Sequence, residues 1–403
     1  FDRTIDYIKA TIAELKSLDN ANSRFQIVDG TIAQIRRSPL GIVLCMGPYN
    51  YPMNETFCTL IPALIMGNVV LFKPPRFGVL LYYPMLEAFR SAFPAGVINI
   101  VYGQGSVVVP HIMGSGKVNV LALIGTSKVA DQLKKAHPKT NRLRAVLGLE
   151  AKNAAIILPD ADIELTVKEC IAGTLSFNGQ RCTAIKMILV HQAIADQFLR
   201  RFNEEIAKLK IGMPWEKGVM LTPLPEMQKV DYMNECIADA VAQGAKVLNA
   251  DGGSSVDTLF YPAVVFPVKA GMKLYREEQF GPVIPVAPFE DVETALDYVI
   301  TSDHGQQVSV FGSDPDQIAH LVDPLVNQVC RVNINCQCQR SPDVFPFAGR
   351  KDSAEGTLSV HDALRSFSIR TMVAAKQTDA SKKLLDSIVL GNKSNFVNTR
   401  FIL

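Results

Sequence analysis

The chain has 403 residues with a formal net charge of +2; 48% of its residues are hydrophobic and 20% are charged. This length allows two domains with substantial cores, and the composition is typical of a soluble globular enzyme. The near-neutral charge gives no indication of a nucleic-acid or anionic-membrane surface, and no apolar run approaches the roughly 20 residues that a bilayer span requires.

The cysteine pattern argues against a metal site. Of the eight cysteines, only Cys336 and Cys338 are closely spaced. A C-x-C pair without a partner cluster or a nearby pair of histidines is a poor zinc site, so we expect no metal. Reduced thiols in a cytoplasmic protein are the simplest interpretation.

The first elements predicted along the chain are a helix and a hairpin. Apolar residues recur at helical spacing through Thr4–Leu18, which predicts an amphipathic helix. Phe25–Ile35 alternates around Asp29-Gly30, a strong hairpin signal.

From Gly41 the pattern alternates between strands and helices. The expected strands are Ile42–Met46, Val69–Lys73, Val97–Val101 and Val118–Ile124, with helices near Glu55–Met66 and Tyr83–Phe93. This alternation predicts a doubly wound parallel sheet of the nucleotide-binding kind.

A second α/β unit begins near Gly148. Its expected strands are Ala154–Leu158, Ile185–Val190, Val264–Phe266 and Val308–Phe311, and its expected helices are Val167–Leu175, Gln197–Leu209, Met227–Gln243 and Val292–Ile300. Asp160 or Asp162 can cap the first of these helices. Near the end of the chain, Ser366–Ala375 alternates like an edge strand.

A thiol stands between the first of those helices and the strand after it, in Phe177-Asn178-Gly179-Gln180-Arg181-Cys182-Thr183-Ala184. A small turn residue, a cation and a thiol at a helix exit suit a nucleophile, because an adjacent arginine or ordered backbone N–H groups can lower the pKa of a thiol. Taken alone, however, a single cysteine is more often a small buried hydrophobic residue.

Three further motifs accompany this stretch: Gly47-Pro48-Tyr49-Asn50-Tyr51-Pro52, Lys73-Pro74-Pro75 and Glu277-Glu278-Gln279-Phe280-Gly281-Pro282. Together and in this order, the four motifs resemble the aldehyde dehydrogenase superfamily over essentially the whole chain. The segments G-Q-R-C-T-A, P-Y-N-Y-P and Q-R-S-P-D-V-F-P-F are most similar to its non-phosphorylating, NADP-dependent glyceraldehyde-3-phosphate dehydrogenase branch.

The resemblance implies an aldehyde-dehydrogenase-like α/β fold. We expect a doubly wound parallel-sheet cofactor domain over residues 1–147, with the hairpin 25–36 as a β oligomerisation element. An α/β catalytic domain over 148–340 follows, and residues 341–403 return to the cofactor domain and form a C-terminal oligomerisation tail. Compared with the family, the chain is expected to lack a substantial N-terminal part, since it starts at Phe1 rather than at a methionine.

The implied activity is NADP-dependent oxidation of an aldehyde, most closely glyceraldehyde 3-phosphate to 3-phosphoglycerate, with NAD as a possible cofactor. Cys182 would attack the aldehyde to form a thiohemiacetal from which hydride can leave. The side-chain amide of Asn50 and the backbone N–H of Cys182 would stabilise the oxyanion. As an isolated residue, Asn50 would be an ordinary turn asparagine.

The general base is where the chain departs from the family. The superfamily carries its base at the Glu of E-L-G-G-K, and the corresponding segment here is Leu147-Gly148-Leu149-Glu150-Ala151-Lys152. Gly148 therefore stands at the position of the base, and Glu150 follows two residues later. In an extended segment Glu150 would face the same way as Gly148, so Glu150 is our expected base for deacylation; the alternative is an ordinary carboxylate at a strand end.

The resemblance also implies the cofactor-binding residues, which are Lys73, Arg76, Gly125, Thr126, Ser127, Glu278 and Phe280. Lys73 would contact the ribose or the 2′-phosphate, and Arg76 would favour NADP because a guanidinium suits that phosphate. Gly125-Thr126-Ser127 would present a helix N-terminus to the pyrophosphate. Glu278 would hold the nicotinamide ribose beside Phe280.

The resemblance further implies a set of residues that binds the substrate phosphate with cations and one hydroxyl, namely Tyr51, Arg181, Arg340 and Arg3. We expect a cytoplasmic homodimer or homotetramer that binds a small aldehyde, neither nucleic acid nor membrane. The alternatives are a dehydrogenase for another small or anionic aldehyde, a thiol-dependent esterase, and a catalytically silent, dehydrogenase-like scaffold.

Overall fold

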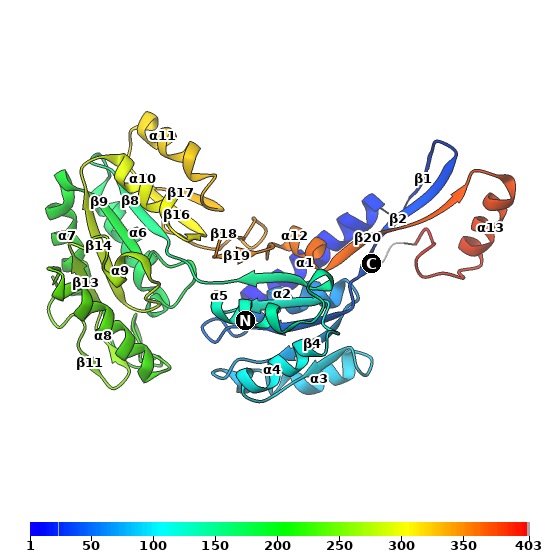
Figure 1. Ribbon diagram of the computed structural model, residues 1–403, viewed down its shortest axis with the longest axis horizontal. Coiled ribbons are helices and arrows are strands. Elements are labelled where there is room, and N and C mark those ends of the chain that lie inside the picture. Colours follow the sequence, from blue (N-terminus) through cyan, green and yellow to red (C-terminus); the bar gives the residue numbers. More distant parts are fainter. Residues whose placement is uncertain (23, 401–403) are drawn as a thin grey trace. The chain divides into compact units, whose positions relative to one another are not determined.

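We describe the fold from a computed structural model, in residues 1–22 and 24–400 and without the side chains of residues 20–22. The chain forms two compact units (Figure 1). Unit 1 comprises Phe1–Leu147, Pro342–Phe347 and Gly356–Leu403, and unit 2 comprises Gly148–Ser341 and Ala348–Glu355. Among the described helices, none is both long and apolar enough to cross a bilayer.

Unit 1 contains a sheet in which neighbouring strands follow the order β7-β6-β3-β4-β5. Its strands are β3 (Ile42–Met46), β4 (Val69–Lys73), β5 (Ile98–Ile100), β6 (Val120–Ile124) and β7 (Arg144–Gly148). The strands from β6 to β5 run parallel, with β3 between β6 and β4. The predicted parallel sheet is therefore confirmed, and the bounds of β3 and β4 are those predicted.

Helices connect these strands, and a helix near the end of the chain packs against the first helix. They are α1 (Asp2–Asn22), α2 (Asn54–Ile65), η1 (Val79–Tyr82), α3 (Met85–Ala92), α4 (Gly105–Gly114), α5 (Ser127–Ala136), η2 (Thr140–Arg142) and α12 (Val360–Ser366). Leu364 of α12 is fully buried in a small core with Leu15 and Met66. The sequence did not predict α4, because Gly105, Pro110 and a run of valines disfavour a helix; burial of its apolar side chains outweighs that preference.

A second sheet of unit 1 is antiparallel and has the order β1-β2-β20. It consists of β1 (Phe25–Val28), β2 (Thr31–Pro39) and β20 (Ser368–Lys376). The predicted hairpin is confirmed, with φ values of 47° at Asp29 and 73° at Gly30, as a tight hairpin turn requires. The predicted edge strand is also confirmed, since β20 lies along the whole of β2 (Figure 1).

Unit 2 is built on a sheet of order β10-β13-β14-β9-β8-β16-β17. The strands are β8 (Ala154–Ile157), β9 (Met187–His191), β10 (Lys246–Val247), β13 (Ala263–Phe266), β14 (Val283–Phe289), β16 (Gln307–Phe311) and β17 (Arg331–Ile334). All neighbours are parallel except β10 and β13. Two short antiparallel pairs lie outside this sheet. The strand β11 (Ser255–Val256) pairs with β12 (Leu259–Phe260), and β15 (His304–Gly305) pairs with β18 (Arg350–Lys351). The remaining short strand, β19, is Ala354–Glu355.

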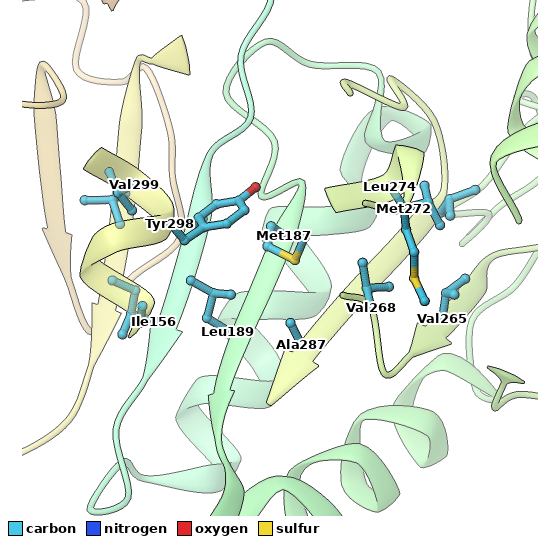
Figure 2. Close-up of a cluster of buried hydrophobic side chains, with 14 of the residues drawn as sticks. Ile156, Met187, Leu189, Val265, Val268, Met272, Leu274, Ala287, Tyr298 and Val299 are labelled. Atoms are coloured by element: carbon cyan, nitrogen blue, oxygen red, sulfur yellow. The ribbon is translucent and has the colours of Figure 1, made fainter. Parts of the chain in front are cut away.

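Both faces of this sheet are buried at its centre, which explains why β8, β9 and β14 are almost continuously apolar in sequence. Ala154 and Ile156 belong to one core, whereas Ala155 and Ile157 belong to the other. Figure 2 shows the first core, where side chains of neighbouring strands meet Tyr298 of a covering helix. The helices of unit 2 are α6 (Ile163–Leu175), η3 (Ser176–Gly179), α7 (Gln192–Ile206), α8 (Met227–Ala242), α9 (Lys273–Arg276), α10 (Val292–Thr301) and α11 (Pro315–Leu325).

Candidate functional site

Four segments of unit 2 meet at one edge of its sheet. Glu150 precedes β8, Cys182 precedes β9, Glu278 precedes β14 and His304 precedes β16. These strands are neighbours in the order β14-β9-β8-β16 and run parallel, so their amino ends share an edge. Three residues predicted from distant parts of the sequence therefore lie at one edge, together with a histidine that was not predicted.

The turn before Cys182 has an unusual backbone. Phe177, Asn178 and Gly179 have φ values of 55°, 60° and 66°, a left-handed region that costs of order 1–3 kcal/mol for a residue other than glycine. Asn178 holds this turn, since its Oδ1 accepts from the Thr222 N–H at 2.9 Å and its Nδ2 donates to the Thr222 carbonyl at 3.1 Å. A Cβ at Gly179 would lie 2.7 Å from the Gly281 carbonyl oxygen, so only glycine fits there.

The peptide carbonyl of Cys182 is fixed by two donors. The side-chain amide of Asn153 and the ammonium of Lys186 each donate to it at 2.8 Å. Lys186 Nζ also lies 2.8 Å from Glu278 Oε1, and the N–H of Ala151 donates to the same oxygen at 3.1 Å. One connected polar network thus joins the Cys182, Glu278 and Glu150 segments, and the partly buried Cys182 thiol belongs to a fixed stretch of backbone.

Two lysines of this network were missed as functional residues by the sequence reasoning. Lys152 donates to the Glu277 carbonyl at 2.6 Å and to Gln279 Oε1 at 2.8 Å. Burial, followed by the charge of Lys186, lowers the pKa of Lys152 to about 7. A signal for Lys186 was present in the sequence, because a single charge inside the apolar run Ile185–Val190 requires a partner once it is buried.

Glu150 lies just beyond the end of a strand. The prediction that Glu150 faces the same way as Gly148 assumed that the strand continues to Glu150. The strand β7 ends at Gly148, so strand pairing does not extend to Glu150. Burial lowers the pKa of His304, whereas the carboxylates of Glu278 and Glu150 oppose that shift. Glu150 therefore lies within electrostatic range of His304 at the site edge, and its role as the base stays a prediction.

The aromatic ring of Phe280 and the two arginines of unit 2 have defined surroundings. The ammonium groups of Lys186 and Lys229 lie 5.9 and 5.8 Å from the centre of the Phe280 ring. Arg181 donates to the Ala172 and Gly173 carbonyls at the end of α6, at 3.1 and 3.0 Å, and Arg340 is 6% exposed. The predicted phosphate contacts of both arginines remain predictions.

Unit 1 gathers its own predicted residues at the carboxyl edge of its sheet. Gly47 follows β3, Lys73 ends β4 and Gly125 follows β6, and these three strands are parallel neighbours. Because the chain continues from β3 to β4 on one side and β6 lies on the other, this edge is a topological switch point, where open α/β sheets bind their ligands.

The turn that carries Asn50 and Tyr51 is held by Tyr82. The hydroxyl of Tyr82 donates to the Pro52 carbonyl and lies 3.1 Å from Thr56 Oγ1. A Cβ at Gly47 would collide with that same threonine hydroxyl, which explains the glycine at the exit of β3. Asn50 and Tyr51 are both partly buried.

Several predicted cofactor residues of unit 1 lie at the N-termini of the helices α4 and α5. Lys73 Nζ lies near Gly105, the first residue of α4, and burial lowers the pKa of Lys73. Thr126 caps α5, since its hydroxyl accepts from the Val129 N–H at 3.3 Å, and Ser127 is the first residue of that helix. A helix N-terminus carries unsatisfied N–H groups and a partial positive charge, which suit a phosphate.

The two remaining predicted cations of unit 1 differ in their surroundings. Arg76 is exposed, with its guanidinium 5.1 Å from the centre of the Phe77 ring. Arg3 forms a two-pronged ion pair with Asp343, in which Nε–Oδ2 is 2.8 Å and Nη2–Oδ1 is 2.7 Å. This pairing engages the Arg3 guanidinium within the protein, and its predicted place in the phosphate set stays a prediction.

Comparisons with known proteins identify one family. The model of the aldehyde dehydrogenase family matches residues 1–373. The NADP-dependent glyceraldehyde-3-phosphate dehydrogenase of Streptococcus equinus is 37% identical over 348 residues, which are 86% of this chain and 70% of that protein. The enzyme of the same name from Triticum aestivum is 33% identical over 84% of this chain and 66% of its own length.

Solved structures of proteins with related names are also similar to this chain. The NADP-dependent glyceraldehyde-3-phosphate dehydrogenase from Bacillus halodurans C-125, complexed with NADP, has a TM-score of 0.87 and 32% identity, covering 94% of this chain and 79% of that one. The glyceraldehyde-3-phosphate dehydrogenase from Methanocaldococcus jannaschii DSM 2661, also complexed with NADP, has a TM-score of 0.82 and 28% identity over 92% of this chain and 81% of that one.

The chain spans about two thirds of the length of these sequence relatives. The fold class and the family resemblance predicted from the four motifs are both confirmed. The chain belongs to the aldehyde dehydrogenase family.

Proposed function

We propose that this protein oxidises glyceraldehyde 3-phosphate to 3-phosphoglycerate with NADP, consuming water and releasing NADPH and two protons. The observation that carries the proposal is the fixed Cys182 peptide, held by Asn153 and Lys186 beside the Glu278 carboxylate. The names of the relatives from Streptococcus equinus and Bacillus halodurans C-125 support the choice of substrate and cofactor.

Cys182 is the proposed nucleophile. Burial raises the pKa of Cys45 to about 12 and that of Cys338 to about 11, so these thiols stay protonated in the core. Cys182 is only partly buried and lies at the site edge. Its thiolate adds to the aldehyde carbon, Asn50 donates to the developing oxyanion, and hydride loss leaves a thioester. Water activated by Glu150 then releases the acid and restores the thiol.

The chain's residues fit a dinucleotide phosphate. Lys73 and the N-termini of α4 and α5 offer positive charge and N–H donors. Glu278 Oε2 accepts no hydrogen bond from any residue in the described ranges, so it can accept from a ribose hydroxyl. When bound, the nicotinamide supplies the hydride acceptor. In this proposal Lys73 and Arg76 bind the 2′-phosphate, Gly125, Thr126 and Ser127 the pyrophosphate, and Glu278 and Phe280 the nicotinamide riboside.

Arg76 gives a test of cofactor choice. We expect Arg76→Glu to weaken NADP binding about ten- to a hundredfold, because a charged contact contributes roughly 1.5–3 kcal/mol, while NAD binding changes little. Calorimetric titration with both cofactors measures the difference. Arg90→Glu, at another exposed arginine of unit 1, is the matched control, and equal losses for NADP and NAD would show that Arg76 does not contact the 2′-phosphate.

The direct test of the proposed function is NADPH formation, followed by absorbance, with glyceraldehyde 3-phosphate and no inorganic phosphate. Turnover of this substrate in preference to an unphosphorylated aldehyde supports the phosphate set Tyr51, Arg181, Arg340 and Arg3. A protein that binds NADP but oxidises only other aldehydes is a dehydrogenase of different specificity, and one that oxidises none under any cofactor condition contradicts the proposal.

We further propose a cytoplasmic homodimer or homotetramer assembled through the β1-β2-β20 sheet and the helix α13 (Asp379–Leu390). Ile27, Met372 and Leu384 are 55%, 59% and 63% exposed there, and α13 buries none of its side chains within the chain. Such exposed apolar surface marks an interface. Light scattering should give at least twice the chain mass of 44.1 kDa, and a monomer at working concentration would contradict this assembly.

A further inference from the structure

Lys186 is a buried cation between two functional groups of unit 2. Its side chain is 1% exposed, and its Nζ lies 2.8 Å from both Glu278 Oε1 and the Cys182 carbonyl oxygen. Burying a charge is costly unless it is paired and hydrogen-bonded. Both requirements are met here by the residues proposed to hold the cofactor and to attack the substrate.

The contacts divide the two oxygens of Glu278 between different tasks. Lys186 and the Ala151 N–H both use Oε1, and no group of the described chain donates to Oε2. The Glu278 side chain is 12% exposed. One oxygen therefore anchors the carboxylate to the protein, and the other is left to accept from an external hydroxyl.

At its other contact, Lys186 orients the backbone of the nucleophile. The Cys182 carbonyl has two lone pairs and receives two donors, Lys186 and Asn153. With both used, the peptide plane after Cys182 has little freedom to rotate. The position of the thiol on that backbone depends on the same ammonium that anchors Glu278.

We propose that Lys186 is a positioning residue that couples cofactor binding at Glu278 to the reactivity of the Cys182 thiol. One ammonium group contacts both partners. A ribose hydroxyl that donates to Glu278 therefore changes the interaction between Glu278 and Lys186, and with it the hydrogen bond from Lys186 to the Cys182 carbonyl. The neighbouring Lys152 contacts the Glu277 carbonyl and Gln279 instead, so the direct link is specific to Lys186. The inference rests on the proposed function, because it requires NADP to contact Glu278.

A double-mutant cycle tests the coupling through binding alone. We expect Lys186→Met and Glu278→Gln each to weaken NADP binding about tenfold, the loss of one charged hydrogen bond. The double variant should also lose about tenfold rather than a hundredfold, because the two residues act as one unit. Calorimetric titration measures the affinities, and circular dichroism establishes that each variant is folded.

A second readout follows the thiol itself. The rate of iodoacetamide alkylation at Cys182 should change about fivefold or more when NADP binds to the parent protein. Mass spectrometry of the peptide that contains Cys182 quantifies this rate. This NADP effect should disappear in both Lys186→Met and Glu278→Gln. Lys229→Met removes another lysine, which lies over the Phe280 ring and within electrostatic range of Glu278 but hydrogen-bonds to neither partner of Lys186, so the effect should persist there.

Each alternative outcome is decisive. Multiplicative losses in the cycle, or an NADP effect on alkylation that survives in Glu278→Gln, would overturn the coupling while leaving the proposed oxidation intact. A parent protein that binds no NADP would overturn both. If Lys186→Met does not fold, Lys186→Gln enters the same cycle under the same criterion, and the Glu278→Gln alkylation result decides the inference without any Lys186 variant.

Discussion

We expect the Cys182→Ser variant to lose aldehyde oxidation by roughly a thousandfold or more, since removing a nucleophile that acts within a concerted set costs that much or more. A serine hydroxyl stays protonated near neutral pH and adds to an aldehyde far less readily than a thiolate. NADP binding should remain close to the parent value, because Glu278 is held by Lys186 and the Ala151 N–H, and Lys186 contacts the Cys182 carbonyl and not its thiol. NADPH absorbance and calorimetric titration measure the two effects.

The matched control is Cys330→Ser, at an exposed thiol of unit 2 that precedes β17 and belongs to none of the four site segments. Partial desolvation of its sulfur raises the pKa of Cys330 although the residue as a whole is exposed, which makes it a poor nucleophile, so this variant should keep parental turnover. More than a few percent of residual turnover in Cys182→Ser would exclude Cys182 as the nucleophile, and loss of turnover in both variants would indicate damage to the fold.

We expect Glu150→Gln to separate the two halves of the reaction. If Glu150 activates the deacylating water, the variant still forms the thioester and releases one equivalent of NADPH per site, while steady turnover falls roughly a hundredfold or more. The acyl enzyme then accumulates because water attacks it slowly. Rapid-mixing absorbance resolves the NADPH burst from the later linear rate.

Glu277→Gln provides the control for losing a nearby negative charge. The Glu277 carboxylate accepts from the Tyr232 hydroxyl at 2.9 Å and has no role in the proposed deacylation, so its loss should leave the linear rate near the parent value. A Glu150→Gln variant with a parental linear rate would assign the water activation to another group or to water alone. Loss of the burst itself would place Glu150 before the hydride step.

Most of the local structure, and the family, could be predicted from residue patterns along the chain. Ile42–Met46 and Val69–Lys73 are almost entirely apolar and each begins with two β-branched residues, so their composition and the alternation with helices predicted β3 and β4 to the residue. Asp29-Gly30 predicted the hairpin, because few other dipeptides accept two positive φ values. The four motifs predicted the family, since each is a short contiguous segment and their order along the chain can be recognised without any knowledge of contacts.

Which side chains meet depends on long-range contacts that the sequence patterns do not contain. The Lys186 ion pair joins residues that are 92 positions apart, and Arg3 is paired with a residue 340 positions away; no local pattern encodes such contacts. Helix α4 forms despite Pro110 because burial of Val109 and Met113 outweighs a weak intrinsic preference. Periodicity reports which face of a segment is apolar, whereas the partner of a buried charge depends on which segments the sheet order brings to one edge. That order depends on long-range pairing, so Lys186 was visible in the sequence only as a charge inside an apolar run.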